Sequence, residues 1–287
     1  MLHMKQYLDD LFETRKYGKW SILLRRGLPW EEAAKILSHD GHITPDENIF
    51  VRVRSSGNAR VFLAPCIFNS HQVQVFFKHY LFRAKRFDFF KHLIRPCRAK
   101  RALQASLMLL EHGFNAPEPL ALLQKTHGPF ATENILVTRG VENSVPLGAR
   151  LKELSAPQDP AVLKAKRRLI AEFGRTVGRM HALGIIHGDL RLNNVLVQNP
   201  EDIPGFFFID NERTRKYKRA PDKLVKKNLV QINMQRDAVS NTDRMRFMRA
   251  YSRQRDLNTN EILFLSQRVV ERTDQRLKKK LYKPKKR

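Results

Sequence analysis

Hydrophobic and polar positions alternate along the first third of the chain. Residues 49–54 (IFVRVR) alternate with a period of two, and an apolar run resumes at 59–64. Between these runs lie four turn-forming residues, Ser55, Ser56, Gly57 and Asn58. Residues 72–78 (QVQVFFK) alternate again and end at Lys78. Because a period of two puts successive side chains on opposite faces of a strand, the pattern predicts a β-hairpin followed by a third strand.

Two later runs have helical spacing, and each stops at a glycine. One extends from about Pro96 to Gly113, and the other covers residues 161–183 before Gly184. Glycine often follows a helix because it adopts the left-handed backbone conformation without steric cost. Both runs are therefore predicted to be helices that end just before these glycines.

The order of the elements predicts an α+β fold. Apolar segments at 120–123 and 134–138 predict two more strands, whereas the chain is mainly helical after about residue 146. We expect three parts along the chain. They are an amphipathic N-terminal helix in residues 1–16, an N-terminal lobe at 17–140, and a C-terminal lobe with a basic tail at 141–287.

Composition excludes several classes of protein. The 287 residues include 54 Lys and Arg against 28 Asp and Glu, a formal net charge of +26, yet 42% are hydrophobic. That apolar fraction is too high for a disordered basic protein, so we expect a folded core with a basic surface. Two cysteines, Cys66 and Cys97, are too few for a disulfide framework. We find neither a signal peptide nor a run of about 18 apolar residues, and expect a cytoplasmic protein, soluble or peripheral to a membrane.

The charged and amide residues near position 190 have the spacing of a phosphoryl-transfer site. The second predicted helix is followed by His187, Gly188 and Asp189. Asn194 lies five residues after Asp189, and Asp210 directly follows the apolar run at 206–209. Transfer from ATP needs a carboxylate to orient the attacking hydroxyl and oxygen ligands for Mg²⁺. This pattern resembles the protein-kinase-like superfamily. The resemblance implies a bilobal fold, Asp189 as the catalytic carboxylate, and Asn194 and Asp210 as metal ligands.

The same resemblance implies a nucleotide site in the N-terminal lobe. Lys78 stands where the superfamily has a phosphate-binding lysine, and the hairpin turn at Ser55, Ser56 and Gly57 would lie over the phosphates of ATP. Backbone groups near Val137 and Arg139 would hold the adenine. An edge lysine and an ordinary hairpin turn are the alternatives that the residues alone leave open.

Longer segments are similar to the lipopolysaccharide core kinases, the Kdo and heptose kinases. The segments are VFFKHY, RPCRAKRALQASLMLLEHGFNAPEPLAL, MHALGIIHGDLRLNNVLV and FFFIDNERTR, and the resemblance covers roughly Val51 to Arg215. It implies phosphorylation of a sugar hydroxyl on the inner core of lipopolysaccharide, with ATP and Mg²⁺, at the cytoplasmic face of the inner membrane.

Some positions depart from the kinase pattern. Ala102 stands where the family has a glutamate that pairs with Lys78, and Asp210 is followed by Asn211 and Glu212 instead of Phe and Gly. Two other functions therefore stay open. One is an atypical protein kinase or RNA-associated kinase, and the other is a pseudokinase that binds a polyanion.

The positive charge indicates polyanionic partners. Residues 213–287 contain 24 Lys and Arg against 7 Asp and Glu, and cations are interleaved with aromatic residues between Phe76 and Arg101. Such segments suit an anionic membrane surface, with the tail at 278–287 as an electrostatic tether. The expected partners are a lipid-linked saccharide or other anionic sugar substrate and an anionic membrane surface, and nucleic acid stays open as a third. The sequence does not define the oligomeric state.

Overall fold

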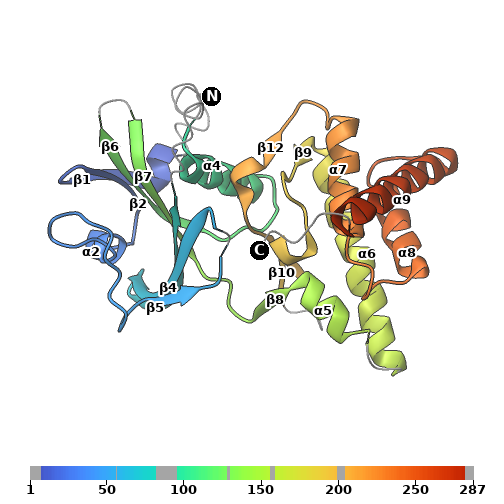
Figure 1. The fold of residues 1–287 in the computed structure, drawn as a ribbon, viewed down its shortest axis with the longest axis horizontal. Coiled ribbons are helices and arrows are strands. Elements are labelled where there is room, and N and C mark those ends of the chain that lie inside the picture. The colour runs from blue at the N-terminus through green and yellow to red at the C-terminus, as the bar shows by residue number, and fades with distance from the viewer. Residues whose placement is uncertain are drawn as a thin grey trace. The chain divides into compact units, whose positions relative to one another are not determined.

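The computed structural model describes residues 8–55, 57–81, 96–127, 130–155, 159–198 and 204–281. They fold into two compact units (Figure 1). The N-terminal unit contains residues 1–111 and 117–140, and the C-terminal unit contains residues 112–116 and 141–287.

The N-terminal unit is built on one antiparallel sheet of seven strands. The order across the sheet is β1-β2-β6-β7-β5-β4-β3. The strands are β1 (Phe12–Tyr17), β2 (Trp20–Arg25), β3 (Val51–Val53), β4 (Ala59–Phe68), β5 (His71–Tyr80), β6 (Pro119–His127) and β7 (Phe130–Arg139). The five strands from β3 to β7 confirm the predictions made from alternating and apolar runs. The predicted hairpin is β3 and β4, which pair from Val51↔Leu63 to Val53↔Val61.

The N-terminal segment differs from the prediction. Residues 1–7 lie outside the described residues, residues 8–11 are helical, and β1 begins at Phe12, so the helix expected over residues 1–16 is wrong from that point. Gly18, with φ +54°, closes a tight turn that brings Tyr17 opposite Trp20. The partner strand β2 buries every second side chain, which fixes the hairpin against the sheet.

Each face of the sheet carries a helix. On one face, Trp20, Ile22 and Phe77 form a core with residues of α2 (Trp30–Ala34) and the segment after it. On the other face, α4 (Arg98–Glu111) packs on a smaller cluster that contains Tyr80. Helix α4 confirms the helix predicted before Gly113, which has φ +70°. Full burial of an aromatic or aliphatic side chain stabilises the fold by about 1.5–3 kcal/mol, so this core accounts for much of the unit's stability.

The C-terminal unit is mainly helical. Its helices are α5 (Leu147–Glu153), α6 (Pro160–Ala182), α7 (Asp222–Asn233), α8 (Asn241–Arg253) and α9 (Thr259–Leu281). Helix α6 confirms the helix predicted before Gly184, and Asp159 caps it by accepting a hydrogen bond from the N–H of Ala161 at 2.8 Å. Helices α6 and α8 pack together, and α7 packs on α9. A Cβ atom at Gly174 of α6 would lie 2.6 Å from the carbonyl oxygen of Phe247, so this glycine allows α8 to approach closely.

Short strands in the C-terminal unit flank the candidate catalytic residues. Strands β8 (Ser144–Pro146), β10 (Val195–Gln198) and β11 (Gly205–Phe208) form one sheet, and β9 (Ile185–Ile186) pairs with β12 (Arg215–Lys216). There are two single 3₁₀ turns: Leu192–Asn194 lies between β9 and β10, and Asn211–Arg213 lies between β11 and β12. A sheet unit followed by a helical unit confirms the predicted α+β class.

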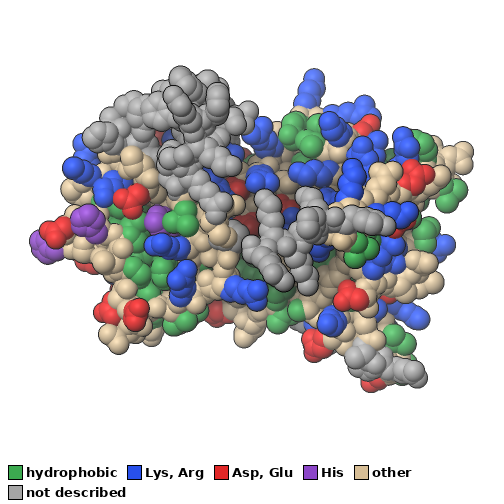
Figure 2. Space-filling view, in the orientation of Figure 1, with side chains coloured by type: hydrophobic (Ala, Val, Ile, Leu, Met, Phe, Trp, Pro, Cys, Tyr) green, Lys and Arg blue, Asp and Glu red, His purple; other side chains and the backbone are tan. Residues whose placement is uncertain are grey.

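Among the described residues, no helix is long and apolar enough to cross a membrane. Lys and Arg side chains are spread over the face shown in Figure 2 and do not gather in one patch there.

Candidate active site

The candidate catalytic loop, called the catalytic loop below, comprises residues 187–194 and follows β9 directly. His187 is fully buried, and burial lowers its pKa, so the ring is neutral. Its Nε2 lies 3.0 Å from the carbonyl oxygen of Ile209, which can only accept, so Nε2 carries the proton. Its Nδ1 accepts a hydrogen bond from the N–H of Asp189 at 3.2 Å. His187 therefore ties the catalytic loop to the residue that precedes Asp210.

The Asp189 carboxylate is held by three side-chain donors. Gln231 Nε2 donates to Oδ1 at 2.6 Å, and Arg191 Nε lies 3.0 Å from the same oxygen. Asn194 Nδ2 donates to Oδ2 at 3.3 Å. The Asp189 side chain is nevertheless 27% exposed, so it is oriented by the loop and still accessible to a substrate hydroxyl.

Asn194 contacts this carboxylate, and Asp210 directly follows Ile209, whose N–H bonds to Asn194. Asn194 Nδ2 also donates to the Asp189 carbonyl oxygen at 2.9 Å, and the Asn194 carbonyl oxygen accepts from the N–H of Ile209 at 3.0 Å. Asp210 comes next in the chain and adopts the left-handed conformation, with φ 62° and ψ 40°. The charges of Asp189 and Asp210 both act on His187. The structure thus brings together the three residues that the sequence singled out in this unit.

These residues fit a Mg²⁺ site that is completed by a nucleotide. The Asn194 amide nitrogen is engaged with Asp189, which leaves the amide oxygen for a cation, and Asp210 is exposed. Within the described ranges, no group of three or more His, Cys, Asp and Glu side chains is placed to hold a metal ion. Mg²⁺ commonly takes one or two protein ligands and fills its octahedron with phosphate oxygens and water, which agrees with this small donor set.

The packing around residue 188 explains why the His-Gly-Asp sequence has a glycine at this position. A Cβ atom at this position would lie 2.1 Å from Cβ of Arg213 and 2.7 Å from the Arg213 carbonyl oxygen. The Gly188 carbonyl oxygen accepts a hydrogen bond from Lys227 Nζ at 3.1 Å. The 3₁₀ turn after Asp210 therefore packs directly on the catalytic loop, and no side chain fits between them.

Lys78 lies on β5 in the N-terminal unit, between Val61 of β4 and Leu136 of β7. Alternation puts it on the sheet face of Tyr80, and its Nζ lies 5.1 Å from the Tyr80 ring centroid. Ala102 of α4 is buried in the cluster that contains Tyr80. The α4 position where the kinase pattern has a glutamate thus carries only the methyl group of Ala102. Lys78 contacts the ring of Tyr80 on the same face of the sheet.

The predicted phosphate loop is partly described. Ser55 Oγ donates to the carbonyl oxygen of Ala59 at 2.8 Å and so closes the hairpin turn, and Gly57 is exposed. Ser56 lies outside the described residues. The hairpin borders an open groove of about 560 Å³, which is lined in part by Arg52, Arg54 and Arg60. These arginines were not predicted as candidate anion ligands from the sequence, although Arg52 and Arg54 alternate with valines directly before the predicted turn.

The segment expected to hold adenine is at the end of β7. The Val137 side chain is fully buried, so only its backbone is suited to contact a ligand. The N–H of Arg139 donates to the Glu118 carbonyl oxygen at 2.8 Å, and that of Gly140 donates to the Gln74 carbonyl oxygen at 2.7 Å. Because both donors are engaged within the N-terminal unit, an adenine contact at Val137 and Arg139 stays a prediction.

Two residues of α7 support the catalytic loop and were missed by the sequence reading. Asn228 is fully buried and its Nδ2 donates to the His187 carbonyl oxygen. Gln231 is 4% exposed and contacts Asp189, as described above. The sequence pattern could have indicated them. The two amide residues are three positions apart on the apolar face of an amphipathic helix, where a buried polar side chain needs a partner.

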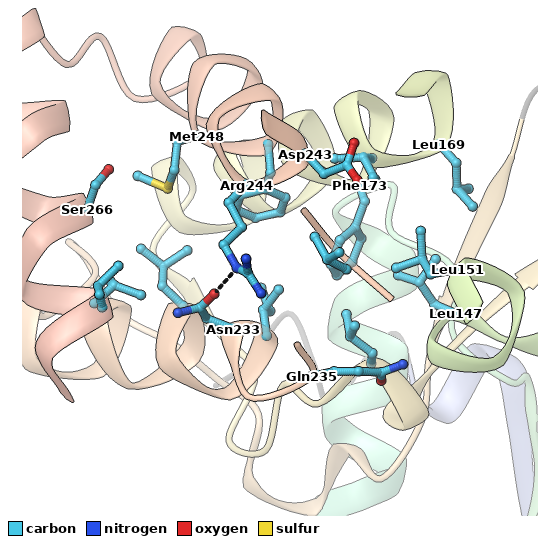
Figure 3. Close-up of a pocket in the computed structure, with 18 residues that line it drawn as sticks. Leu147, Leu151, Leu169, Phe173, Asn233, Gln235, Asp243, Arg244, Met248 and Ser266 are labelled. Carbon is cyan, nitrogen blue, oxygen red and sulfur yellow. Dashed lines mark hydrogen bonds between the residues drawn. The ribbon is translucent and has the colours of Figure 1, made fainter. Parts of the chain in front are cut away.

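An apolar cavity lies among the helices of the C-terminal unit (Figure 3). It has a volume of about 90 Å³ and is lined mainly by aliphatic and aromatic side chains of α5 to α9, among them Leu151, Phe173 and Val269. At its wall, Arg244 Nε donates to Asn233 Oδ1 at 2.8 Å. None of the residues proposed for catalysis lines this cavity, although Leu192 of the catalytic segment does.

Comparison with known proteins gives one family and one fold. The model of the lipopolysaccharide kinase (Kdo/WaaP) family matches residues 52–251. No curated protein matches the chain significantly. Among solved structures, one described as "WaaP in complex with acyl carrier protein" is similar, with a TM-score of 0.63 and 20% sequence identity. The match covers 91% of this chain and 99% of that chain.

Proposed function

We propose that this chain, which belongs to the lipopolysaccharide kinase (Kdo/WaaP) family, transfers the γ-phosphoryl group of ATP to a sugar hydroxyl of the lipopolysaccharide inner core. Membership makes it a phosphotransferase that uses ATP. The observation that carries the proposal is the Asp189 carboxylate, which three donors orient beside Asn194 while part of it stays exposed.

Each candidate residue has a role in this proposal. Asp189 orients the acceptor hydroxyl and takes its proton, and Asn194 and Asp210 hold Mg²⁺. A Mg²⁺ ion held there would supply positive charge that stabilises the negative charge developing on the phosphates during transfer. Lys78 would bind the phosphates together with the hairpin turn of Ser55, Ser56 and Gly57, and the backbone at Val137 and Arg139 would receive adenine.

The acceptor is tested with radiolabelled ATP and a panel of substrates. Lipid-linked core saccharide with a Kdo or heptose residue should be labelled in the presence of Mg²⁺, and a chelator should remove the label. Labelling of peptide or RNA instead would identify a protein kinase or an RNA-associated kinase and refute the proposed acceptor. If nothing is labelled and millimolar ATP with Mg²⁺ does not raise the thermal midpoint, the chain is a pseudokinase.

The same panel tests the place of action. We propose that the kinase works at the inner face of the membrane, where anionic lipid attracts its cations at up to about 1 kcal/mol each. Lipid-linked acceptor in vesicles that contain anionic lipid should be phosphorylated faster than in neutral vesicles. Added salt should remove this difference, because it screens the attraction. Equal rates on both kinds of vesicle would contradict the membrane placement.

We also propose that an acyl carrier protein binds the C-terminal unit, with the end of its acyl chain in the apolar cavity. The similar solved structure is described as a complex with acyl carrier protein. The cavity has an apolar lining, and none of the proposed catalytic residues is part of it. Acyl-loaded carrier protein should bind more tightly than unloaded carrier protein, because insertion buries methylene groups worth about 0.8 kcal/mol each.

Two substitutions on α9 distinguish binding of the acyl chain in the cavity from binding at the surface of the helix. Val269→Trp should fill the cavity and remove the preference for the loaded carrier, because Val269 is 6% exposed and lines it. Leu263→Trp is the matched control, since Leu263 lies on the same helix, is 56% exposed and does not line the cavity. Equal affinity of the parent protein for loaded and unloaded carrier, measured by calorimetry, would rule out this site.

A further inference from the structure

A chain of polar side chains runs through the C-terminal unit from the end of α8 to Asp189. It passes through Arg255, Tyr251, His181, Asn228 and Gln231. The four inner members are 4% exposed or less, so water does not compete for their hydrogen bonds. Buried polar groups are costly unless they are paired, and here the pairing forms a single continuous path.

Two backbone groups fix the orientation of both amides. The carbonyl oxygen of His187 can only accept, so the Asn228 atom that faces it is Nδ2, and Oδ1 turns toward His181. The N–H of Leu190 can only donate, so the Gln231 atom 3.2 Å from it is Oε1, and Nε2 turns toward Asp189. Asn228 Nδ2 also donates to Gln231 Oε1 at 3.3 Å.

The remaining protons follow from these orientations. Burial lowers the pKa of His181 to about 4, so the ring is neutral at neutral pH. Asn228 Oδ1 lies 3.2 Å from Nε2, which must therefore carry the ring proton, and Nδ1 accepts from the Tyr251 hydroxyl at 3.0 Å. Burial raises the pKa of Tyr251 to about 12, so its hydroxyl keeps the proton that it donates. The Tyr251 oxygen accepts from Arg255 Nη1 at 3.3 Å.

Every step thus donates in the same direction, from the Arg255 guanidinium to the Asp189 carboxylate. Hydrogen bonds aligned in this way polarise one another, and the last bond, at 2.6 Å, is shorter than a typical neutral N–H···O bond. Of the three side chains that donate to this carboxylate, Gln231 of α7 makes the shortest bond and is the most deeply buried.

We infer that Gln231 is the positioning residue for Asp189, and that Asn228, His181 and Tyr251 hold Gln231 in its donating orientation. The inference rests on the proposed function, because it assigns these residues to the base of the transfer reaction. Neither Gln231 nor the residues behind it needs to touch substrate. Their effect is therefore expected on the chemical step and not on nucleotide affinity.

The test compares Gln231→Leu with the parent enzyme. Loss of the amide donor should lower kcat about 10-fold or more and leave KM for ATP within about 2-fold, because the carboxylate turns away from the hydroxyl. Gln267→Leu is the control, because Gln267 Nε2 donates to the exposed Glu271 carboxylate at 3.1 Å. It should match the parent.

A second variant covers the case in which Gln231→Leu does not fold. Tyr251→Phe removes one hydroxyl and keeps the ring, so the fold should persist while kcat falls about 2- to 5-fold, with the same unchanged KM. If folded Gln231→Leu, or failing that folded Tyr251→Phe, keeps the parent kcat, the inference is wrong. If the parent itself transfers no phosphate, the proposed function has failed, which is a different result.

Discussion

Replacing Asp189 with alanine is expected to abolish phosphoryl transfer while the protein keeps its fold and its affinity for ATP. The carboxylate is the one group in the loop that is both oriented by three donors and partly exposed, so the acceptor hydroxyl loses its orienting base. General acid–base catalysis typically contributes about 100- to 10,000-fold, and we expect a loss of at least about 100-fold in kcat. Transfer of radiolabel from ATP measures this rate directly.

Two controls make the loss specific to this position. Asp237→Ala removes another carboxylate of the same unit, which is exposed and lies outside the catalytic loop, and it should leave the rate unchanged. The thermal midpoint of Asp189→Ala, with and without ATP and Mg²⁺, should show the nucleotide-dependent rise of the parent protein. Full turnover by Asp189→Ala would remove this residue from the mechanism.

Gly188→Ala is expected to have the second largest effect, although it adds only one methyl group. The new Cβ would lie 2.1 Å from Cβ of Arg213, and both atoms belong to segments held by hydrogen bonds. Either the catalytic loop or the 3₁₀ turn must move. Overpacking of this kind typically costs about 1–3 kcal/mol, and the displacement should also misplace Asp189. Denaturant unfolding measures the lost stability, and the transfer assay measures the lost rate.

The matched control for this change is Gly205→Ala on β11. The nearest atom to a Cβ there is 3.4 Å away, and the backbone conformation is ordinary, so an alanine should be accommodated. An alanine at position 188 that is as stable and as active as the one at 205 would show that the loop and the turn do not pack as tightly as described.

Local signals in the sequence were sufficient for most elements. Helices α4 and α6 were predicted because helical spacing and a following glycine agree, and both glycines have positive φ. Strand β5 was predicted from the alternation of residues 72–78, and β4 was predicted from the apolar run of residues 59–64. The hairpin of β1 and β2 was missed because β1 is charged and buries only Phe12, so its strand conformation depends on pairing with β2.

The residues of the candidate site likewise fall into those that local sequence spacing predicted and those that only tertiary packing brings together. Asp189, Asn194 and Asp210 were found because a short loop and one hairpin fix their spacing. Gln231 was missed because it reaches Asp189 from α7, 42 positions along the chain, and only tertiary packing makes that contact. The surroundings of Lys78 depend likewise on which residue of α4 faces the sheet, and Ala102 fills that place with a methyl group.

The contact between Gly188 and Arg213 links two segments whose sequences stand 25 positions apart. Any residue larger than glycine at 188 requires another path for the 3₁₀ turn Asn211–Arg213, and the present path of that turn requires glycine at 188. Among members of the family, the two segments should therefore change together. A chain with arginine before the catalytic aspartate should also carry a different residue pattern after the metal-binding aspartate.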